Sequence, residues 1–184
     1  FLEKKGLKNI LLIGYDYIDE RLMGTLVPGP EGVFYGHMYH AYSAGMFQID
    51  SQGGFQRWTG SAYFYEAQLV LGSNNYIYAT NNDTWVPGSI DRYDIGKQTL
   101  MLDWRMEPFT QNSDASTPLV ELDDGYFYGA AGEGGANEGG FIYRFRLDGS
   151  GFGIIHYFHD VDTGMKPYAG LTAYNGFLYG TTTY

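Results

Sequence analysis

The segment Leu119-Val-Glu-Leu-Asp-Asp-Gly-Tyr-Phe-Tyr-Gly129 decides the fold, because the chain repeats its pattern four times. The pattern is a short apolar run, a turn pair and an aromatic strand that contains a tyrosine. Asp-Gly between apolar runs predicts two antiparallel strands joined by a type I′ turn. The lead leucines are Leu26, Leu69, Leu119 and Leu171, so successive repeats begin 43, 50 and 52 residues apart. The turn pairs are Glu31-Gly32, Asn74-Asn75, Asp124-Gly125 and Asn175-Gly176, and the repeated tyrosines are Tyr35, Tyr78, Tyr128 and Tyr179.

Two more strands follow in each of the first three repeats. The third strand ends in Asp50, Asp94 or Asp148, and a glycine-containing turn comes next. An aspartate side chain there is expected to accept a hydrogen bond from the turn backbone. The fourth strand ends in an aromatic residue: Trp58, Trp104 or Phe158. Each complete unit is therefore predicted to be a four-stranded antiparallel meander, with strands A to D in chain order.

A four-stranded unit repeated every 40 to 50 residues predicts an all-β fold, a β-propeller of four-stranded antiparallel blades. One such sheet cannot bury both of its faces, so neighbouring units must stack. A β-sandwich has similar strand spacing, but it does not predict that the tyrosine recurs at nearly the same position in each repeat. No sustained 3.6-residue periodicity occurs, so we expect very little helix. The predicted blades are 26–58, 69–104, 119–158 and 171–184 within a single domain, 1–184, or a fragment of one.

The two ends of the sequence predict partial blades. Residues 1–15 read as the tail of a preceding blade, and 171–184 supply only strands A and B. Three full blades are fewer than the four to eight that propellers usually have. Either the chain is part of a longer one or its two ends share a blade in a four-bladed ring. We favour the longer chain, because the shared blade would lack most of strand C.

Composition narrows the class of partner. The 184 residues contain 11 Lys and Arg against 21 Asp and Glu, a net charge of −10. The chain therefore lacks the basic stripe that nucleic acids and anionic membranes require. The longest purely apolar run, 10–13, is too short for a membrane-spanning helix. Cysteine is absent, which excludes disulfides and thiolate metal sites but does not assign a compartment.

Residues 119–182 resemble a known family. They contain Asn175-Gly-Phe-Leu-Tyr-Gly-Thr-Thr182, which is similar to the Asp-Gly-x-Leu-Tyr-Gly-Thr-Thr core of the GloVer tandem repeat of exported or surface-anchored bacterial proteins. The first two units depart from that core and look more like generic propeller blades of secreted polysaccharide lyases. The resemblance implies an extracellular or cell-surface location and no established activity.

Strand order divides the connections between two rims. The A–B and C–D turns are short and lie on one rim, here called the short-turn rim. The B–C and D–A connections vary in length and lie on the other, here called the long-connection rim. Binding residues concentrate on variable loops held by a rigid scaffold. The predicted ligand-binding residues on the long-connection rim are Tyr39, His40, Tyr42, Asp83, Trp85, Glu133, Asn137, Arg105, His159 and Tyr168, and Lys166 lies on the same connection as Tyr168.

Aromatic planes beside carboxylates and amides suit sugars, because sugar C–H faces stack on rings while hydroxyls form hydrogen bonds. The competing explanation is that these aromatic residues simply cap the core between blades. A polysaccharide lyase is the alternative function, with His37, Tyr39, His40 and Arg57 as candidate catalytic residues. Residues three apart on a strand point to opposite faces, so His37 and His40 are more simply ordinary strand residues.

No motif establishes a cofactor. Asp160-Val-Asp162-Thr-Gly164 begins like a calcium loop but lacks the distal Glu of an EF-hand, so Asp160 and Asp162 form only a weak calcium candidate. Residues 132–140 are glycine-rich but lack the lysine and helix of a phosphate loop. We therefore expect no cofactor.

The sequence predicts a non-enzymatic, exported or cell-surface module that binds glycan or a protein partner. It predicts neither nucleic-acid binding nor membrane insertion. The alternatives are a propeller-type lyase acting on uronate polymers and a structural repeat of a surface fibre or adhesin.

Overall fold

The computed structural model is all-β in the part of the chain that it describes, namely residues 20–40, 43–62, 68–83, 86–101, 117–135 and 138–184. Fourteen strands and one short 3-10 turn, η1 (Pro30–Gly32), occur in these residues. The described part has no helix of the length and hydropathy that crossing a membrane requires.

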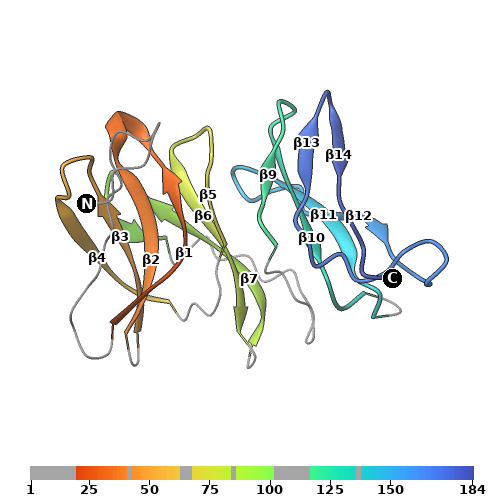
Figure 1. Cartoon of the computed structure of the whole chain (residues 1–184). Coiled ribbons are helices and arrows are strands. Elements are labelled where there is room, and N and C mark those ends of the chain that lie inside the picture. Colours follow the sequence, from red (N-terminus) through yellow and green to blue (C-terminus); the bar gives the residue numbers. More distant parts are fainter. Residues whose placement is uncertain (1–19, 41–42, 63–67, 84–85, 102–116, 136–137) are drawn as a thin grey trace, which may run out of the picture.

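The strands form three four-stranded antiparallel sheets and one two-stranded sheet, each in chain order (Figure 1). The first sheet contains β1 (Glu20–Pro28), β2 (Phe34–His40), β3 (Ser43–Ile49) and β4 (Phe55–Ala62); the second β5 (Gln68–Leu71), β6 (Tyr76–Asp83), β7 (Val86–Asp94) and β8 (Thr99–Leu100); the third β9 (Val120–Glu121), β10 (Tyr126–Ala131), β11 (Phe141–Arg146) and β12 (Gly153–Tyr157); and the fourth β13 (Thr172–Tyr174) and β14 (Phe177–Tyr179).

Consecutive sheets pack against each other through shared apolar cores, as the blades of a β-propeller do. The predicted fold class is confirmed, with four strands in each of the first three sheets and two in the fourth. The first strand begins at Glu20, earlier than the expected Leu26. The predicted N-terminal blade tail, 1–15, lies outside the described residues.

The repeated tyrosines mark the interfaces between blades. Tyr35 belongs to the core between the first and second sheets, Tyr78 to the next core and Tyr128 to the third. These three side chains are 4%, 0% and 7% exposed, whereas Tyr179 on β14 is 54% exposed. The repeated position of the tyrosine in the first three units therefore marks the face of each blade that packs on the following blade.

Polar contacts also join the sheets. The backbone amide of Ser73, in the β5–β6 turn, donates to Oε2 of Glu121 in β9 (2.8 Å). The Thr80 hydroxyl donates to the carbonyl oxygen of Thr117 (3.2 Å). The Thr117 hydroxyl donates to the Ala130 carbonyl (2.6 Å) and accepts from the Ala130 amide (3.0 Å). Thr117 thus links the second sheet to β10 through its carbonyl and its hydroxyl.

Two of the four A–B turns have the predicted geometry. Glu31 and Gly32 have φ of 56° and 76°, and Asn175 and Gly176 have φ of 50° and 77°. Positive φ at both central residues is the property of a type I′ turn.

The other two A–B turns differ, and the type I′ prediction for Asp124-Gly125 is wrong. Only the last turn residue has positive φ, 61° at Asn75 and 79° at Gly125. The Gly125 amide donates to the Leu122 carbonyl (3.1 Å), which makes a three-residue loop. Asp124 Oδ1 accepts from the Tyr126 amide (3.1 Å) in an Asx turn, which stabilises this loop.

The predicted aspartate turns after the third strands are confirmed. Asp50 Oδ1 accepts from the Gln52 and Gly54 amides, both at 2.8 Å. Asp148 Oδ1 accepts from the Ser150 amide at 2.8 Å. These carboxylates therefore have a structural role in the short-turn rim.

The expectation of long B–C loops is wrong for the first two blades. Tyr39 and His40 lie in β2, paired with Ala44 and Ser43 of β3, so only 41–42 separate the two strands. Asp83 ends β6 and pairs with Val86 of β7. The antiparallel ladder continues to the tip of each hairpin because pairing satisfies the backbone N–H and C=O groups of these residues. The third blade alone has a long B–C connection within the described chain, 132–140.

Candidate functional site

Two connections of the third blade meet on the long-connection rim. Residues 132–140 join β10 to β11, and residues 158–171 join β12 to β13. The Lys166 amide donates to the Gly139 carbonyl (2.7 Å), and the Phe158 amide donates to the Gly140 carbonyl (3.0 Å). These backbone bonds hold the two connections side by side.

Glycine is required where the connections touch. A Cβ on Gly132 would lie 2.2 Å from Cδ1 of Tyr168, and one on Gly139 would lie 2.2 Å from the carbonyl oxygen of Phe158. Gly140 has a φ of +87°, which favours glycine. The glycine-rich run therefore allows the aromatic ring and the second connection to approach the backbone closely.

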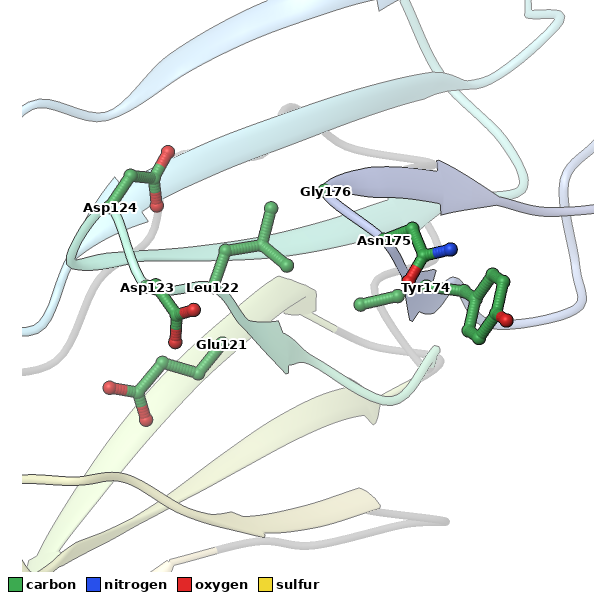
Figure 2. A pocket seen from close by; sticks show the side chains of 8 residues that line it. Glu121, Leu122, Asp123, Asp124, Tyr174, Asn175 and Gly176 are labelled. Carbon is green, nitrogen blue, oxygen red and sulfur yellow. The ribbon is translucent and has the colours of Figure 1, made fainter.

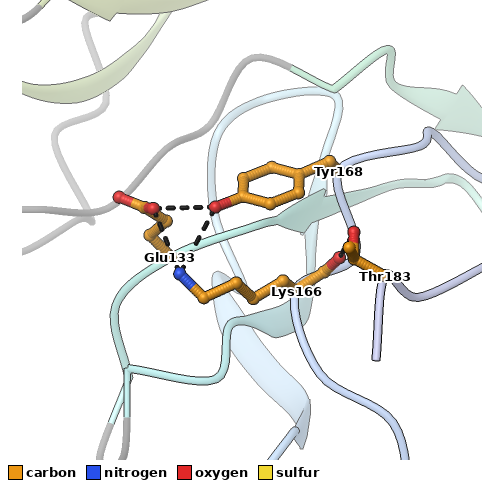
Figure 3. Close-up of polar contacts among 4 residues, drawn as sticks. All are labelled: Glu133, Lys166, Tyr168 and Thr183. Carbon is orange, nitrogen blue, oxygen red and sulfur yellow. Dashed lines mark hydrogen bonds and ion pairs between the residues drawn. The ribbon is translucent and has the colours of Figure 1, made fainter.

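Three side chains converge at this junction (Figure 3). The Tyr168 hydroxyl donates to Glu133 Oε1 at 2.7 Å. Lys166 Nζ donates to the same oxygen at 3.3 Å and to the Tyr168 hydroxyl oxygen at 3.4 Å. Figure 3 shows the second carboxylate oxygen of Glu133 pointing away from both donors. We call this group, Glu133, Lys166 and Tyr168, the rim cluster.

The rim cluster is accessible to solvent. Tyr168 is 44% exposed although one side of its ring lies on the Gly132 backbone. The side chains of Lys166 and Glu133 are 30% and 44% exposed. The cluster therefore presents an aromatic ring, an anion and a cation together at the surface.

The hydrogen bonds fix the protonation states of the cluster. The Tyr168 hydroxyl, and secondarily Lys166, lowers the pKa of the Glu133 carboxyl. Burial and the bond to Glu133 raise the pKa of the Tyr168 phenol. Tyr168 and Glu133 raise the pKa of the Lys166 ammonium. At neutral pH the cluster consists of a carboxylate, a phenol and an ammonium.

The C-terminal residues hold Lys166 in place. Lys166 has a φ of 58°, which is uncommon outside glycine. Its carbonyl accepts from the Thr183 amide (3.2 Å) and hydroxyl (3.2 Å), and the Met165 carbonyl accepts from the Tyr184 amide (3.3 Å). The sequence contains no local signal for this contact, because the two segments pair only in the folded chain.

The structure brings together some of the predicted ligand-binding residues. Glu133 and Tyr168 meet as expected for residues of one rim, and Lys166 completes the group. His159 lies on the same connection and is exposed, with its ring 6.1 Å from the Tyr157 ring.

Other predicted residues are only partly placed. The backbones of Tyr39, His40 and Asp83 are in β2 and β6, and their side chains lie outside the described part. The remaining predicted ligand-binding residues, Tyr42, Trp85, Arg105 and Asn137, lie outside the described residues.

The candidate catalytic residues His37 and Arg57 differ in solvent exposure. His37 is fully buried in β2, on the face toward the second sheet, and burial lowers its pKa to about 4. Arg57 is exposed in β4. A polymer cannot reach His37 in this packing, so the geometry does not support a catalytic role for it.

Asp160 stabilises a turn. Its Oδ1 accepts from the amides of Asp162 (2.9 Å) and Thr163 (3.0 Å) and from the Thr163 hydroxyl (3.2 Å). These bonds lower the pKa of its carboxyl. The described residues contain no group of three or more acidic, His or Cys side chains placed to hold a metal. The geometry of Asp160 and Asp162 is therefore that of an acidic turn, and calcium binding there stays a prediction.

A cavity of about 420 Å³ lies on the short-turn rim, between the A–B turns of the third and fourth blades (Figure 2). Sequence reasoning missed it because each turn is short when considered alone. Asp124 Oδ2 accepts from the Tyr128 hydroxyl (2.7 Å), and Glu121 is bonded to Ser73 of the second blade. Two of the carboxylates that line the cavity, those of Asp124 and Glu121, therefore accept hydrogen bonds that stabilise the blades. The lining residues are Glu121, Leu122, Asp123, Asp124, Ala173, Tyr174, Asn175 and Gly176.

No protein-family model and no curated protein sequence matches the chain. Similar solved structures include a bifunctional GH43-CE protein of Bacteroides eggerthii, with a TM-score of 0.49, 10% identity, and coverage of 89% of this chain and 26% of that one. A xylan β-1,4-xylosidase of Bacillus halodurans C-125 has a TM-score of 0.45, 15% identity, and coverage of 76% and 30%. The chain thus spans less than a third of either structure, and a likeness of this extent carries no information about activity. Membership of the GloVer family stays a prediction.

Proposed function

We propose that this chain is an exported or cell-surface propeller module that binds glycan at the rim cluster. The observation that carries the proposal is the convergence of Tyr168, Glu133 and Lys166 on one accessible junction. The extracellular location rests on the resemblance of residues 119–182 to an exported repeat.

The cluster offers the contacts that a sugar ring uses. The partly exposed Tyr168 ring provides an apolar plane, since aromatic side chains combine a large apolar surface with a polar tip. Glu133 accepts and Lys166 donates hydrogen bonds, and charged partners make stronger hydrogen bonds than neutral ones. The bonds among the three side chains hold them in position before a ligand arrives, which lowers the entropy cost of binding.

The protonation states favour binding over proton abstraction. A lyase that uses tyrosine as its base needs a phenol that ionises near the working pH. The pKa of Tyr168 is raised, not lowered, because burial and the adjacent Glu133 carboxylate both oppose the phenolate. The pKa of Glu133 is lowered, so the carboxylate is also a weak base. The rim cluster is therefore suited to holding a ligand and not to deprotonating it.

Glycan binding can be tested by screening the chain on a glycan array and measuring the hits by calorimetry. We expect Tyr168→Ala to weaken binding about tenfold or more, because about 1.4 kcal/mol of stacking and hydrogen bonding corresponds to tenfold in affinity. Tyr168→Phe keeps the ring and should lose less.

Tyr174→Ala is the matched control, since Tyr174 is an exposed tyrosine on the other rim. Absence of any glycan ligand would contradict the proposal, as would equal losses in Tyr168→Ala and Tyr174→Ala. Binding of a protein instead, sensitive to Tyr168→Ala, would assign the same surface to a protein partner.

A further inference from the structure

The charges around the rim cluster restrict the class of glycan. Residues 132–140 and 158–171 carry four carboxylates, on Glu133, Glu138, Asp160 and Asp162. Against them stand the Lys166 ammonium and the imidazole of His159, and the whole chain has a net charge of −10. The two connections that bear the proposed site therefore carry more negative than positive charge.

The positive charge of Lys166 does not compensate for this negative charge when an anionic ligand approaches. Its ammonium lies 3.3 Å from Glu133 Oε1, so its charge is already balanced inside the cluster. A uronate carboxylate that entered would meet a neutral ion pair on a connection that carries two further carboxylates, Asp160 and Asp162. Like charges placed opposite each other oppose association and can cost several kcal/mol.

We infer that the ligand of the rim cluster is an uncharged glycan. Glu133 Oε2 accepts from one ring hydroxyl, Lys166 Nζ donates to a neighbouring one, and the sugar face stacks on Tyr168. This inference rests on the proposed function, and it separates the site from one that recognises uronate polymers.

The test uses polymers that share a backbone and differ in charge. Two such pairs are polygalacturonate with its methyl ester, and carboxymethylcellulose with hydroxyethylcellulose. Affinity electrophoresis or calorimetry of the 184-residue chain should show binding of an uncharged member and at least tenfold weaker binding of its charged counterpart. Because exposed charges are screened over about 8 Å at physiological ionic strength, added salt should narrow the difference.

Glu133→Gln gives a second, opposite prediction. The change removes one negative charge and releases Lys166 from its ion pair, so affinity for the charged polymer should rise severalfold. Affinity for the uncharged polymer should fall, since the amide is a weaker acceptor. Asp123→Asn on the short-turn rim changes the net charge equally and should leave both affinities unchanged.

The outcomes distinguish the two levels of the argument. Binding of a charged polymer as tightly as its uncharged counterpart would overturn the inference and leave glycan binding standing. Failure of every polymer in the pairs and on the array would overturn the proposed function and the inference with it. A rise in affinity for the charged polymer in Asp123→Asn equal to that in Glu133→Gln would assign the effect to net charge and overturn the role of Lys166.

Discussion

The hydroxyl of Tyr78 in the second blade donates a hydrogen bond of 2.5 Å to the carbonyl oxygen of Leu147 in the third. The Tyr78 ring lies 4.6 Å from the Phe127 ring, centroid to centroid, in the core between the same blades. The side-chain amide of Asn74 donates from Nδ2 to the Tyr78 hydroxyl oxygen at 2.8 Å. One repeated tyrosine therefore supplies both an apolar and a polar contact across the interface.

Tyr78→Phe should keep the apolar contact and remove the polar one. We expect the free energy of unfolding to fall by about 1 kcal/mol, because the partly buried Leu147 carbonyl loses its hydroxyl donor and keeps the weaker 3.4 Å bond from Nη1 of Arg92. Urea denaturation measures this change. Tyr174→Phe removes a hydroxyl from an exposed ring and should have almost no effect. Equal stability of the two variants would show that the bond to Leu147 contributes nothing.

Thr117→Val should be more costly than its small change in shape implies. The variant leaves the Ala130 amide and carbonyl without the hydroxyl that satisfies both. Unsatisfied buried backbone groups cost about 1 to 3 kcal/mol each. We expect a loss of about 2 kcal/mol or more in chemical denaturation. Thr172→Val, in the exposed β13, is the matched control, and a loss as large there would contradict the assignment.

Burial of His37 should make stability depend on pH. Its pKa is lowered from 6.5 to about 4, so the folded state binds fewer protons than the unfolded state. The stabilisation is complete above pH 6.5 and is lost as the pH falls toward 4, by about 3 kcal/mol in total. The carboxyl groups whose pKa is lowered, those of Glu133, Asp148 and Asp160, act mainly at lower pH, so the interval from 6.5 to 5 reports mainly the histidine.

His37→Gln should flatten the stability curve over this interval, because the substituted side chain does not titrate. Unfolding free energies measured at half-unit pH steps provide the comparison. An unchanged slope in His37→Gln would mean that another group carries the dependence.

Gly132→Ala should weaken ligand binding without unfolding the chain. The new methyl group would lie 2.2 Å from the Tyr168 ring, so the ring must move away from Glu133 and Lys166. We expect about a tenfold loss of glycan affinity by calorimetry, with the circular dichroism spectrum retained. Gly153→Ala adds a methyl group where nothing lies within 4 Å and should bind as the unsubstituted chain does. Tight binding by Gly132→Ala would separate the ring position from ligand affinity.

The sequence was sufficient to predict the sheets because each blade is built from neighbouring residues. Alternation places Tyr35, Tyr78 and Tyr128 on the same face in each of the first three units, and that face packs on the following blade. The aspartate turns were also predictable, because Asp50 and Asp148 bond to amides only a few residues away. Periodicity and local turn chemistry are both encoded within one repeat.

The rim cluster could be predicted only as residue types on one rim. Glu133 and Tyr168 belong to different connections, and their contact depends on where β11 and β12 return the chain. Strand ends are also set by pairing, which is why Tyr39 and Asp83 are strand residues and not loop residues. Neither the contact between the two connections nor the pairing at the strand ends can be inferred from residue spacing in a single sequence.

The exposed face of the β13–β14 hairpin has a consequence for how this arc of blades comes apart. Each of the first three sheets has four strands, whereas in the described residues β14 pairs with β13, and Tyr179 lies largely in solvent. In stacked repeats stability is close to a sum over nearest-neighbour contacts, so within the 184-residue chain the two-stranded sheet, with its exposed side chains, should have the smallest share. In that chain, amide exchange of Leu178 should be faster than that of Ile77 or Phe127, and local opening of the described sheets should begin at the fourth.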